Sequence, residues 1–377
     1  MIYRKTEDFD AFSCLAGRCP DTCCGGWDVE IDEKSAAEYS SLNTPLGERI
    51  RKSIDWETGC FAQEGGRCVL LDGAGLCEIQ KELGGEALCD TCRIFPRHVE
   101  EYENVREYSL SLSCPEAARL LLEKEDKRNF YEYETKEEPE EFEEFDRELY
   151  GYLRKARELF LQILQNRNIP VRRRIEIILK RSASLQDCLD EDAVDDMAEI
   201  IKDTERVCGG KLPDSLEETE EAQSADYRHK RVEYACFYEM DWLRPQWGEL
   251  VEDTWKGLFA KGEEEYGRLW EAFHGDKERE ARLELMREQL LVAYVDLYVC
   301  GAVYDGELFS KAALAVFCTR WIEEFLLFRF SISEKKFSLL EEATAVTYRF
   351  AREVEHSDNN LLLLEDWAKS RIMVQKI

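Results

Sequence analysis

Four cysteines lie within eleven residues near the start of this chain, and this cluster constrains the fold more than any other feature. Cys14, Cys19, Cys23 and Cys24 are followed directly by Gly25-Gly26-Trp27. Ten of the fifteen cysteines precede residue 115. Thiolates are soft ligands for zinc, copper and iron–sulfur clusters. The sequence therefore predicts a metal or cluster site in the N-terminal third, in a small module that its ligands hold together.

The rest of the chain indicates the cellular compartment in which such a site would function. The N-terminus has no positively charged stretch followed by an apolar run, so no secretory signal is expected. Charged residues interrupt the most apolar stretch, 312–330, which predicts an amphipathic helix and no membrane span. We expect a cytoplasmic protein whose thiols stay reduced, and reduced thiols in a cluster favour metal over disulfides.

The charge balance narrows the choice of partner. The chain has 377 residues and a formal net charge of −30. Binding to nucleic acid needs clustered Lys and Arg, so nucleic acid is not an expected partner. A basic protein, or a substrate that presents lysines, would be attracted instead. The acidity also has a plain explanation in solubility alone.

The expected fold is mainly α, with a small irregular cysteine-rich module before a helical domain. We assign residues 1–119 to the cysteine-rich module and 120–148 to an acidic connecting segment. Residues 149–377 form the helical domain, in which 209–226 lack apolar periodicity and predict a mobile loop. The sequence does not indicate an oligomeric state.

Several local patterns support this division. Alternating polarity predicts a short strand over 27–32, and Pro115 predicts the first turn of a helix. Ser331-x-x-Glu334 predicts a capping box for a final long helix. Apolar residues recur at helical spacing in four stripes: Leu149, Leu153, Ala156, Phe160, Ile163 and Leu164; Val171, Ile175, Ile178 and Leu179; Leu290, Tyr294, Leu297 and Tyr298; Leu314, Phe317, Trp321, Phe325 and Phe328.

The cysteine spacings fit no common site. A radical-SAM site needs C-x3-C-x2-C and plant-type ferredoxins need C-x4-C-x2-C, but Gly26 and Thr22 occupy the third positions. A turn at Asp72-Gly73 would bring Cys68 and Cys77 together. Cys89-x2-Cys92 has a gap found in both zinc and iron–sulfur sites, so the metal stays open at this point.

Other residues have ordinary structural explanations. Cys60 and Cys89 can be small buried hydrophobes, and His98 can be a hydrogen-bonded structural residue although it lies near the cysteines. We expect five scattered cysteines to pack in the core: Cys188, Cys208, Cys236, Cys300 and Cys318.

The N-terminal residues 1–119 resemble the flagellin lysine N-methylase family, whose N-terminal part is related to small cysteine-rich zinc- or iron-chelating domains. Four blocks in the same order carry the resemblance: Phe12 to Asp32, Cys68 to Gly84, Leu88 to Arg97, and Ser109 to Arg119. The remaining two-thirds of the chain is similar only around residues 287–295.

This resemblance implies transfer of methyl groups from S-adenosylmethionine to lysine side chains of flagellin. It also implies an iron–sulfur cluster, [4Fe–4S], with zinc as the alternative metal. The cysteines that match by position are Cys14, Cys19, Cys23, Cys24, Cys68, Cys77, Cys92 and Cys114. These are more than one four-iron cluster needs, so either two metal centres exist or some of the thiols are structural.

The residues themselves do not show the donor site or the catalytic groups. No glycine-rich strand–turn–helix of the kind that binds S-adenosylmethionine in doubly wound methyltransferases is present in the sequence. Two alternatives to a methyltransferase therefore stay open. One is a non-catalytic metal-binding module, and the other is a redox protein that hands electrons to a partner.

Overall fold

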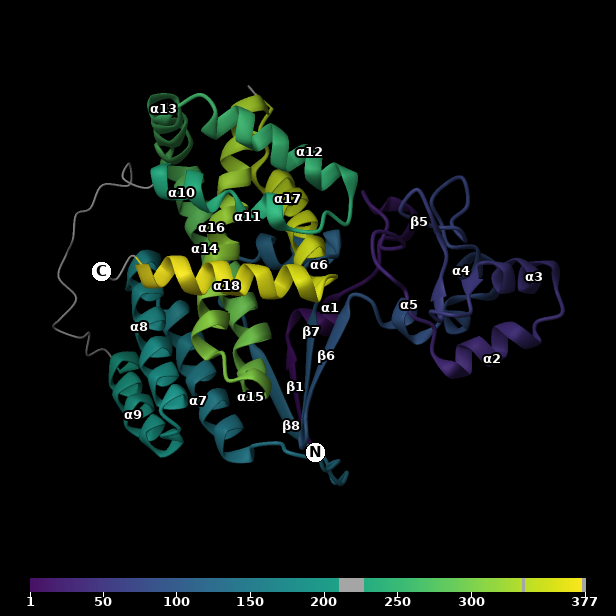
Figure 1. Cartoon of the computed structure of the whole chain (residues 1–377), viewed down its shortest axis with the longest axis horizontal. Coiled ribbons are helices and arrows are strands. Elements are labelled where there is room, and N and C mark those ends of the chain that lie inside the picture. Colours follow the sequence, from purple (N-terminus) through teal and green to yellow (C-terminus); the bar gives the residue numbers. More distant parts are fainter. Residues whose placement is uncertain (210–226, 334–335, 375–377) are drawn as a thin grey trace.

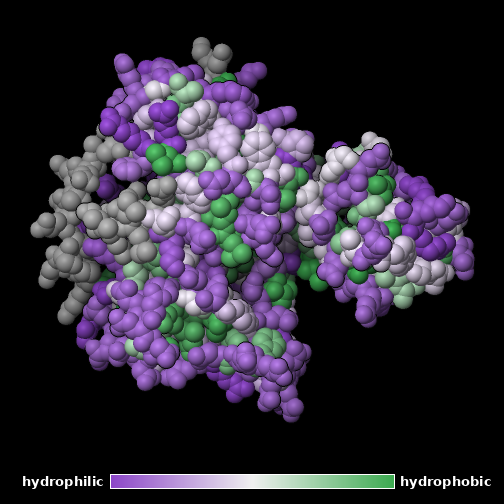
Figure 2. Space-filling model, viewed as in Figure 1, coloured by the Kyte–Doolittle hydropathy of each residue, from purple (hydrophilic) through white to green (hydrophobic). Residues whose placement is uncertain are grey.

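A computed structural model describes residues 1–209, 227–333 and 336–374, with no side chains described for 371–374. Two lobes make up this part of the chain (Figure 1). A large helical body carries the teal, green and yellow elements, and a smaller lobe in purple and blue carries α2 to α5. Figure 2 shows that the smaller lobe meets the body only along a restricted junction and that mostly hydrophilic side chains cover both lobes in this view.

A four-stranded sheet lies against the helical body, in the order β6-β7-β1-β8. Its strands are β1 (Ile2–Thr6), β6 (Arg97–Tyr102), β7 (Val105–Leu110) and β8 (Phe130–Glu134). The N-terminal strand β1 is central, parallel to β7 with Ile2 opposite Val105, and antiparallel to β8 with Ile2 opposite Glu134.

The smaller lobe has short elements around its own apolar cluster. Val29, Tyr39, Ile50, Leu70 and Ile79 are buried in this cluster. The helices of the lobe are α2 (Glu33–Ser41), α3 (Pro45–Lys52), α4 (Glu78–Leu83) and α5 (Asp90–Ile94). Two-residue strands form two small hairpins: β2 (Ile54–Asp55) with β3 (Cys60–Phe61), and β4 (Gln63–Glu64) with β5 (Arg67–Cys68).

The helical body is built around α16 (Leu308–Ser333), which contacts α8, α14, α17 and α18. The other helices of this part, with the short helix α1 beside the sheet, are α1 (Asp8–Ala11), α6 (Pro115–Glu123), α7 (Arg147–Leu164), α8 (Val171–Asp190), α9 (Met197–Cys208), α10 (Tyr227–Glu233), α11 (Cys236–Glu239), α12 (Pro245–Thr254), α13 (Glu263–His274), α14 (Lys277–Tyr298), α15 (Ala302–Asp305), α17 (Leu339–Glu355) and α18 (Asp358–Val374). A π-helical turn, Trp255–Phe259, extends α12.

The mainly helical fold with a cysteine-rich N-terminal part confirms the predicted fold class. All four apolar stripes lie on helices, namely α7, α8, α14 and α16, and Pro115 is the first residue of α6. The domain boundaries stay a prediction, although Tyr102, Val105 and Leu112 belong to the main core.

Two local predictions were wrong. Residues 27–32 form no strand, only an isolated bridge from Glu30 to Cys60, although Val29 and Ile31 are buried as alternation requires. Ser331 caps no helix because α16 continues through Ser333 and the next helix begins at Leu339. Within the acidic segment, Phe130–Glu134 forms β8, which pairing with β1 stabilises despite its exposed side chains. The loop predicted at 209–226 lies, apart from Gly209, outside the described residues.

None of the described helices has an apolar stretch long enough to cross a bilayer, as the interrupted stretch 312–330 predicted.

Candidate metal centre and the adjoining pocket

A chamber of about 630 Å³, lined by the smaller lobe and by the start of α6, collects nine cysteines. All eight cysteines singled out by position line it, together with a ninth: Cys14, Cys19, Cys23, Cys24, Cys68, Cys77, Cys89, Cys92 and Cys114. Cys60 and the five late cysteines do not line it. Cys236, Cys300 and Cys318 are buried in the main core, and Cys188 and Cys208 pack against it, as predicted.

The adjacent pair Cys23-Cys24 stands between two groups of thiols. Its two sulfur atoms are 3.9 Å apart. The Cys23 thiol interacts electrostatically with Cys14 and Cys114, and the Cys19 thiol also has Cys14 as a neighbour. One group is therefore Cys14, Cys19, Cys23 and Cys114.

The second group surrounds Cys24. Electrostatic interactions join the thiols of Cys68 and Cys77 to Cys24 and Cys89, and those of Cys92 to Cys24, Cys77 and Cys89. The backbone holds this group together, because the Cys68 N–H donates to the Cys24 carbonyl at 2.9 Å. An isolated bridge pairs Leu71 with Cys77 across the turn at Asp72. The chamber thus has enough thiols for more than one four-cysteine site.

Two glycines let the cysteine loop reach this position. A Cβ on Gly25 would lie 2.3 Å from the Gly66 carbonyl oxygen, so no side chain fits between the loop and the β4–β5 turn. Gly26 has φ +80°, a backbone conformation that favours glycine, and a Cβ there would lie 2.5 Å from the Arg244 Nε. Glycine is therefore required at both positions, because other parts of the chain approach the loop closely on both sides.

The protonation of the thiols differs across the chamber. The hydrogen bond with Cys23 lowers the pKa of Cys24, with Arg244 and Arg67 assisting, which favours its thiolate form. Burial raises the pKa of Cys68 to about 11 and that of Cys114 to about 11. Thiols of this kind become ligands when a metal displaces their protons.

The donor set is the kind that soft metals bind. Among the described residues, no three Cys, His, Asp or Glu side chains converge closely enough to hold a metal ion as they stand. Four cysteine thiolates can hold either a zinc ion or an iron–sulfur cluster. The nine thiols around the chamber suit both chemistries.

Residues near the cysteines have distinct roles. Arg93 and Arg97 line the chamber, where their positive charges would offset the negative charge of thiolates. His98 does not line it, and its Nε2 lies 2.6 Å from Glu100. Trp27 donates from Nε1 to the Cys23 carbonyl at 2.9 Å and stacks on His356 at 4.7 Å between ring centres. Trp27 therefore anchors the cysteine loop against α17.

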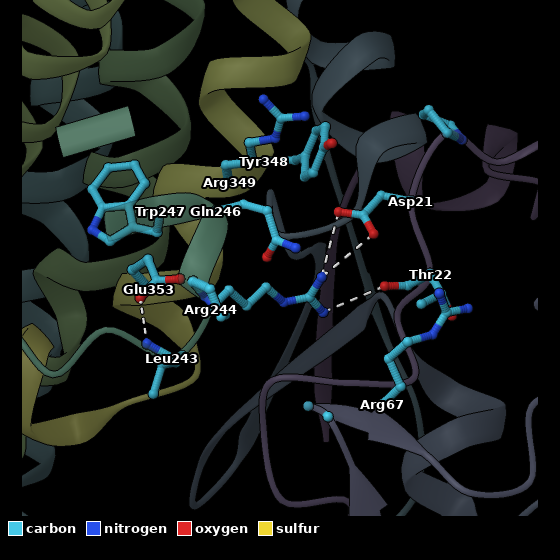
Figure 3. Close-up of a pocket in the computed structure, with 14 residues that line it drawn as sticks. Asp21, Thr22, Arg67, Leu243, Arg244, Gln246, Trp247, Tyr348, Arg349 and Glu353 are labelled. Carbon is cyan, nitrogen blue, oxygen red and sulfur yellow. Dashed lines mark hydrogen bonds and ion pairs between the residues drawn. The ribbon is translucent and has the colours of Figure 1, made fainter. Parts of the chain in front are cut away.

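A second pocket, of about 330 Å³, lies between the lobes and adjoins the chamber (Figure 3). Pro20, Asp21, Thr22 and Arg67 line both cavities and form the shared wall. The helical body contributes 243–247, at the start of α12, and three residues of α17. Sequence reasoning missed this site because its residues are far apart in the chain and only the fold brings them together.

Arg244 links the two lobes in this pocket. Its guanidinium lies 3.4 Å from Asp21 and also donates to the carbonyls of Thr22 and Gly25. The buried Arg352 of α17 also pairs with Asp21 and donates to the Ser113 carbonyl at 2.9 Å. One carboxylate therefore serves two arginines at the junction.

Comparison with known proteins identifies the helical part. Residues 157–373 match the FliB lysine N-methylase C-terminal domain. This chain belongs to the FliB lysine N-methylase family. The family resemblance drawn from the cysteine-rich blocks is thereby confirmed.

Curated relatives give the same family from a shorter match. Over 120 residues the chain is 34% identical to the flagellar biosynthetic protein FliU of Salmonella muenchen. The matched segment covers 29% of this chain and 71% of that protein. Identity is also 34% over 120 residues with the lysine-N-methylases of Salmonella typhimurium and Salmonella choleraesuis. That match spans 29% of this chain but only 30% of each of those enzymes. No solved structure matches the chain.

Proposed function

We propose that this protein transfers methyl groups from S-adenosylmethionine to lysine side chains of flagellin and that its cysteine chamber holds an iron–sulfur cluster. The observation that carries the proposal is membership of a lysine N-methylase family, together with a thiol-lined chamber that shares a wall with the pocket reaching the family's C-terminal domain. A relative named for flagellar biosynthesis supports flagellin as the substrate.

The reaction is a balanced methyl transfer. The neutral amine of a lysine attacks the methyl carbon, the carbon–sulfur bond of the sulfonium breaks, and a carbon–nitrogen bond forms. The products are methyl-lysine, a proton and S-adenosylhomocysteine. The net charge of −30 would draw a lysine-bearing surface to the protein.

The chamber residues would hold the cluster. Cys24 and its neighbours Cys68, Cys77, Cys89 and Cys92 supply one set of thiolates. The group at Cys14, Cys19, Cys23 and Cys114 supplies the other. When bound, an iron–sulfur cluster supplies one-electron redox chemistry or a Lewis-acidic iron. The lowered pKa of Cys24 favours the thiolate that a metal needs.

Methylation is tested with flagellin from cells that lack this protein. Purified anaerobic protein, S-adenosylmethionine and flagellin should give lysine-containing peptides heavier by about 14 Da per methyl group. The matched control omits the donor. Unmodified flagellin in the complete reaction would overturn the substrate assignment.

The cluster is tested on the same preparation. The protein should be brown, with absorption near about 400 nm, and should contain iron and sulfide. Cys24→Ser should lose most of the iron, whereas Cys318→Ser, in the main core, should keep it. Colourless protein with stoichiometric zinc would overturn the cluster. Iron without any donor binding would favour the metal-binding or redox alternative.

A further inference from the structure

Strand β8 lies at one edge of the four-stranded sheet (Figure 1). Within the described part of the chain, its only strand neighbour is β1. The opposite edge, β6, is covered in part, because Tyr304 of α15 donates to the Glu101 carbonyl at 2.7 Å. The amides and carbonyls on the outer side of an edge strand are a template for pairing with another chain.

The register between β1 and β8 determines which backbone groups point outward. Along an antiparallel ladder, residues that exchange hydrogen bonds with the partner strand alternate with residues that do not. The Thr135 N–H donates to the Met1 carbonyl at 2.9 Å, which fixes this alternation for β8. Every second residue before Thr135 therefore bonds to β1. The residues between them direct their N–H and C=O groups to the outer edge, and these are Phe130, Glu132 and Glu134.

The exposed side chains of β8 are of two kinds, one on each face of the strand. Tyr131 and Tyr133 are each 51% exposed. Glu132 and Glu134, also exposed, alternate with them. Glu132 pairs with Arg154 of α7, so the glutamates are on the face toward the helical body and the tyrosines are on the opposite face. A strand added at this edge would therefore meet carboxylates on one face and aromatic rings on the other.

Charge selects the partner of this edge. A second copy paired with β8 would place glutamates beside glutamates, and like charges in that position are destabilising. Such charges protect edge strands from self-association. Here the protection is of one sign, and the following residues 136–144 add six glutamates and one lysine. A segment that carries lysines would meet opposite charge along the edge, and ammonium groups also bind to tyrosine rings.

We infer that β8 docks an extended, lysine-bearing segment of the protein substrate, which adds to the sheet as a fifth strand. Lysines of the segment pair with the glutamates on one face and lie against the tyrosine rings on the other. Since β8 lines neither the thiol chamber nor the pocket between the lobes, this surface anchors the substrate away from both cavities. The inference rests on the proposed function, because it names the surface that holds the substrate of that reaction.

Amide hydrogen exchange on the full chain tests the pairing. The probe is a peptide of alternating lysine and valine, and the control peptide has glutamate in place of each lysine. The lysine peptide should slow exchange at the outward amides of Phe130, Glu132 and Glu134. The amides of Tyr131 and Tyr133, already bonded to β1, should change little. A lysine peptide that does not bind, or that binds without protecting β8, would overturn the inference, as would equal protection by the glutamate peptide.

Two variants separate backbone pairing from charge. Glu134→Pro removes an outward N–H, which an edge strand tolerates, together with the carboxylate. Glu134→Gln removes only the charge. The lysine peptide should bind about tenfold more weakly to Glu134→Pro and about threefold more weakly to Glu134→Gln than to wild type. The difference between wild type and Glu134→Gln should shrink as salt rises.

A matched control changes an acidic residue beyond the strand. Glu143→Gln removes one exposed carboxylate from the acidic segment and should bind the lysine peptide like wild type. Melting temperatures check that each variant is folded, and Glu134→Gln keeps the test valid if the proline disturbs β8. Wild-type affinity in both Glu134 variants would contradict the docking strand.

Flagellin distinguishes this inference from the proposed function. Glu134→Pro should raise the KM for flagellin and leave kcat unchanged, since it weakens docking alone. If wild type methylates flagellin and Glu134→Pro does so with the same KM, the docking strand is wrong and the methyltransferase proposal stands. If wild type methylates no flagellin, the proposed function itself fails. A wild-type dimer that Glu134→Pro converts to a monomer in analytical ultracentrifugation would show that a second copy occupies the edge, and would overturn the choice of partner.

Discussion

At the scale of single residues, a buried ion-pair network fixes the sheet to the helices. Arg157 of α7 is fully buried and donates to both carboxylate oxygens of Glu107 on β7. Arg4 of β1 lies 2.5 Å from Asp296 of α14 and 3.5 Å from Glu107. Burial opposes ionisation of Asp296, yet the pKa falls because Arg4 and Arg157 stand beside it. A buried charge of this kind stays stable only while each of its partners is present.

Arg157→Met should therefore destabilise the protein strongly. Glu107 would lose its main cation in a buried site, and breaking such a pair costs about 3–5 kcal/mol. Denaturant unfolding measures the change. The control Arg154→Met, one turn earlier in α7, removes a more exposed pair with Glu132 and should cost at most about 1 kcal/mol. Equal losses in both variants would contradict the network.

Glu355, at the end of α17, should make stability fall as the pH rises. Burial raises the pKa of its carboxyl to about 7, against a hydrogen bond from Ser111. The folded state then holds a proton that the unfolded state releases near pH ~4.3, so this contribution is complete below that pH and disappears as pH rises through about 7.

The neutral variant Glu355→Gln removes that dependence. Relative to wild type, its free energy of unfolding should rise progressively between pH 5 and pH 7.5 in unfolding titrations. Wild type loses stability over this range because its folded state holds a proton that its unfolded state has released. Glu341→Gln, on the exposed first turn of α17, should follow the wild-type pH profile. Parallel profiles for wild type and Glu355→Gln would show that this carboxyl titrates normally.

At the scale of elements, helices were predictable and the sheet was not. The apolar stripe from Leu149 to Leu164 has a clear helical period, because α7 buries one continuous face. Strand β8 has four exposed side chains out of five, so no apolar alternation marks it. Its pairing with β1 depends on residues more than a hundred positions apart. Local pattern does not encode such long-range pairing.

In the candidate site, too, the features marked by local sequence were predictable and those that depend on long-range contacts were not. Clustering of Cys14 to Cys24 in sequence was enough to predict a thiol site, and the Cys89-x2-Cys92 gap could have identified Cys89 as a chamber residue. Nothing local indicates that Arg349 and Arg67 line one pocket. They do so only because the fold places β5 and α17 on its two sides.

The loop at Gly25 should be intolerant of a side chain. In Gly25→Ala the new Cβ would meet the backbone of Gly66 and force the cysteine loop away from β5. We expect a lower melting temperature and loss of bound metal, measured on anaerobic protein. Gly73→Ala is the matched control, because nothing lies within 4 Å of its Cβ position. Full metal content in Gly25→Ala would show that the loop adjusts without cost to the chamber.

At the scale of the whole molecule, Asp21 joins the two lobes. It is the carboxylate partner of both Arg244 and Arg352, and Arg352 is only 1% exposed. In Asp21→Asn the buried guanidinium of Arg352 would lose its counter-charge, at a cost of about 1–3 kcal/mol or more. The contact between the cysteine lobe and α17 should loosen, since Arg244 also reaches across it.

Small-angle X-ray scattering of Asp21→Asn should then show a larger radius of gyration, with faster proteolysis at the junction between the lobes. Asp28→Asn, an exposed change in the same lobe, should leave both unchanged. Unaltered scattering in Asp21→Asn would mean that Trp27, stacked on His356, holds the lobes together without the ion pairs.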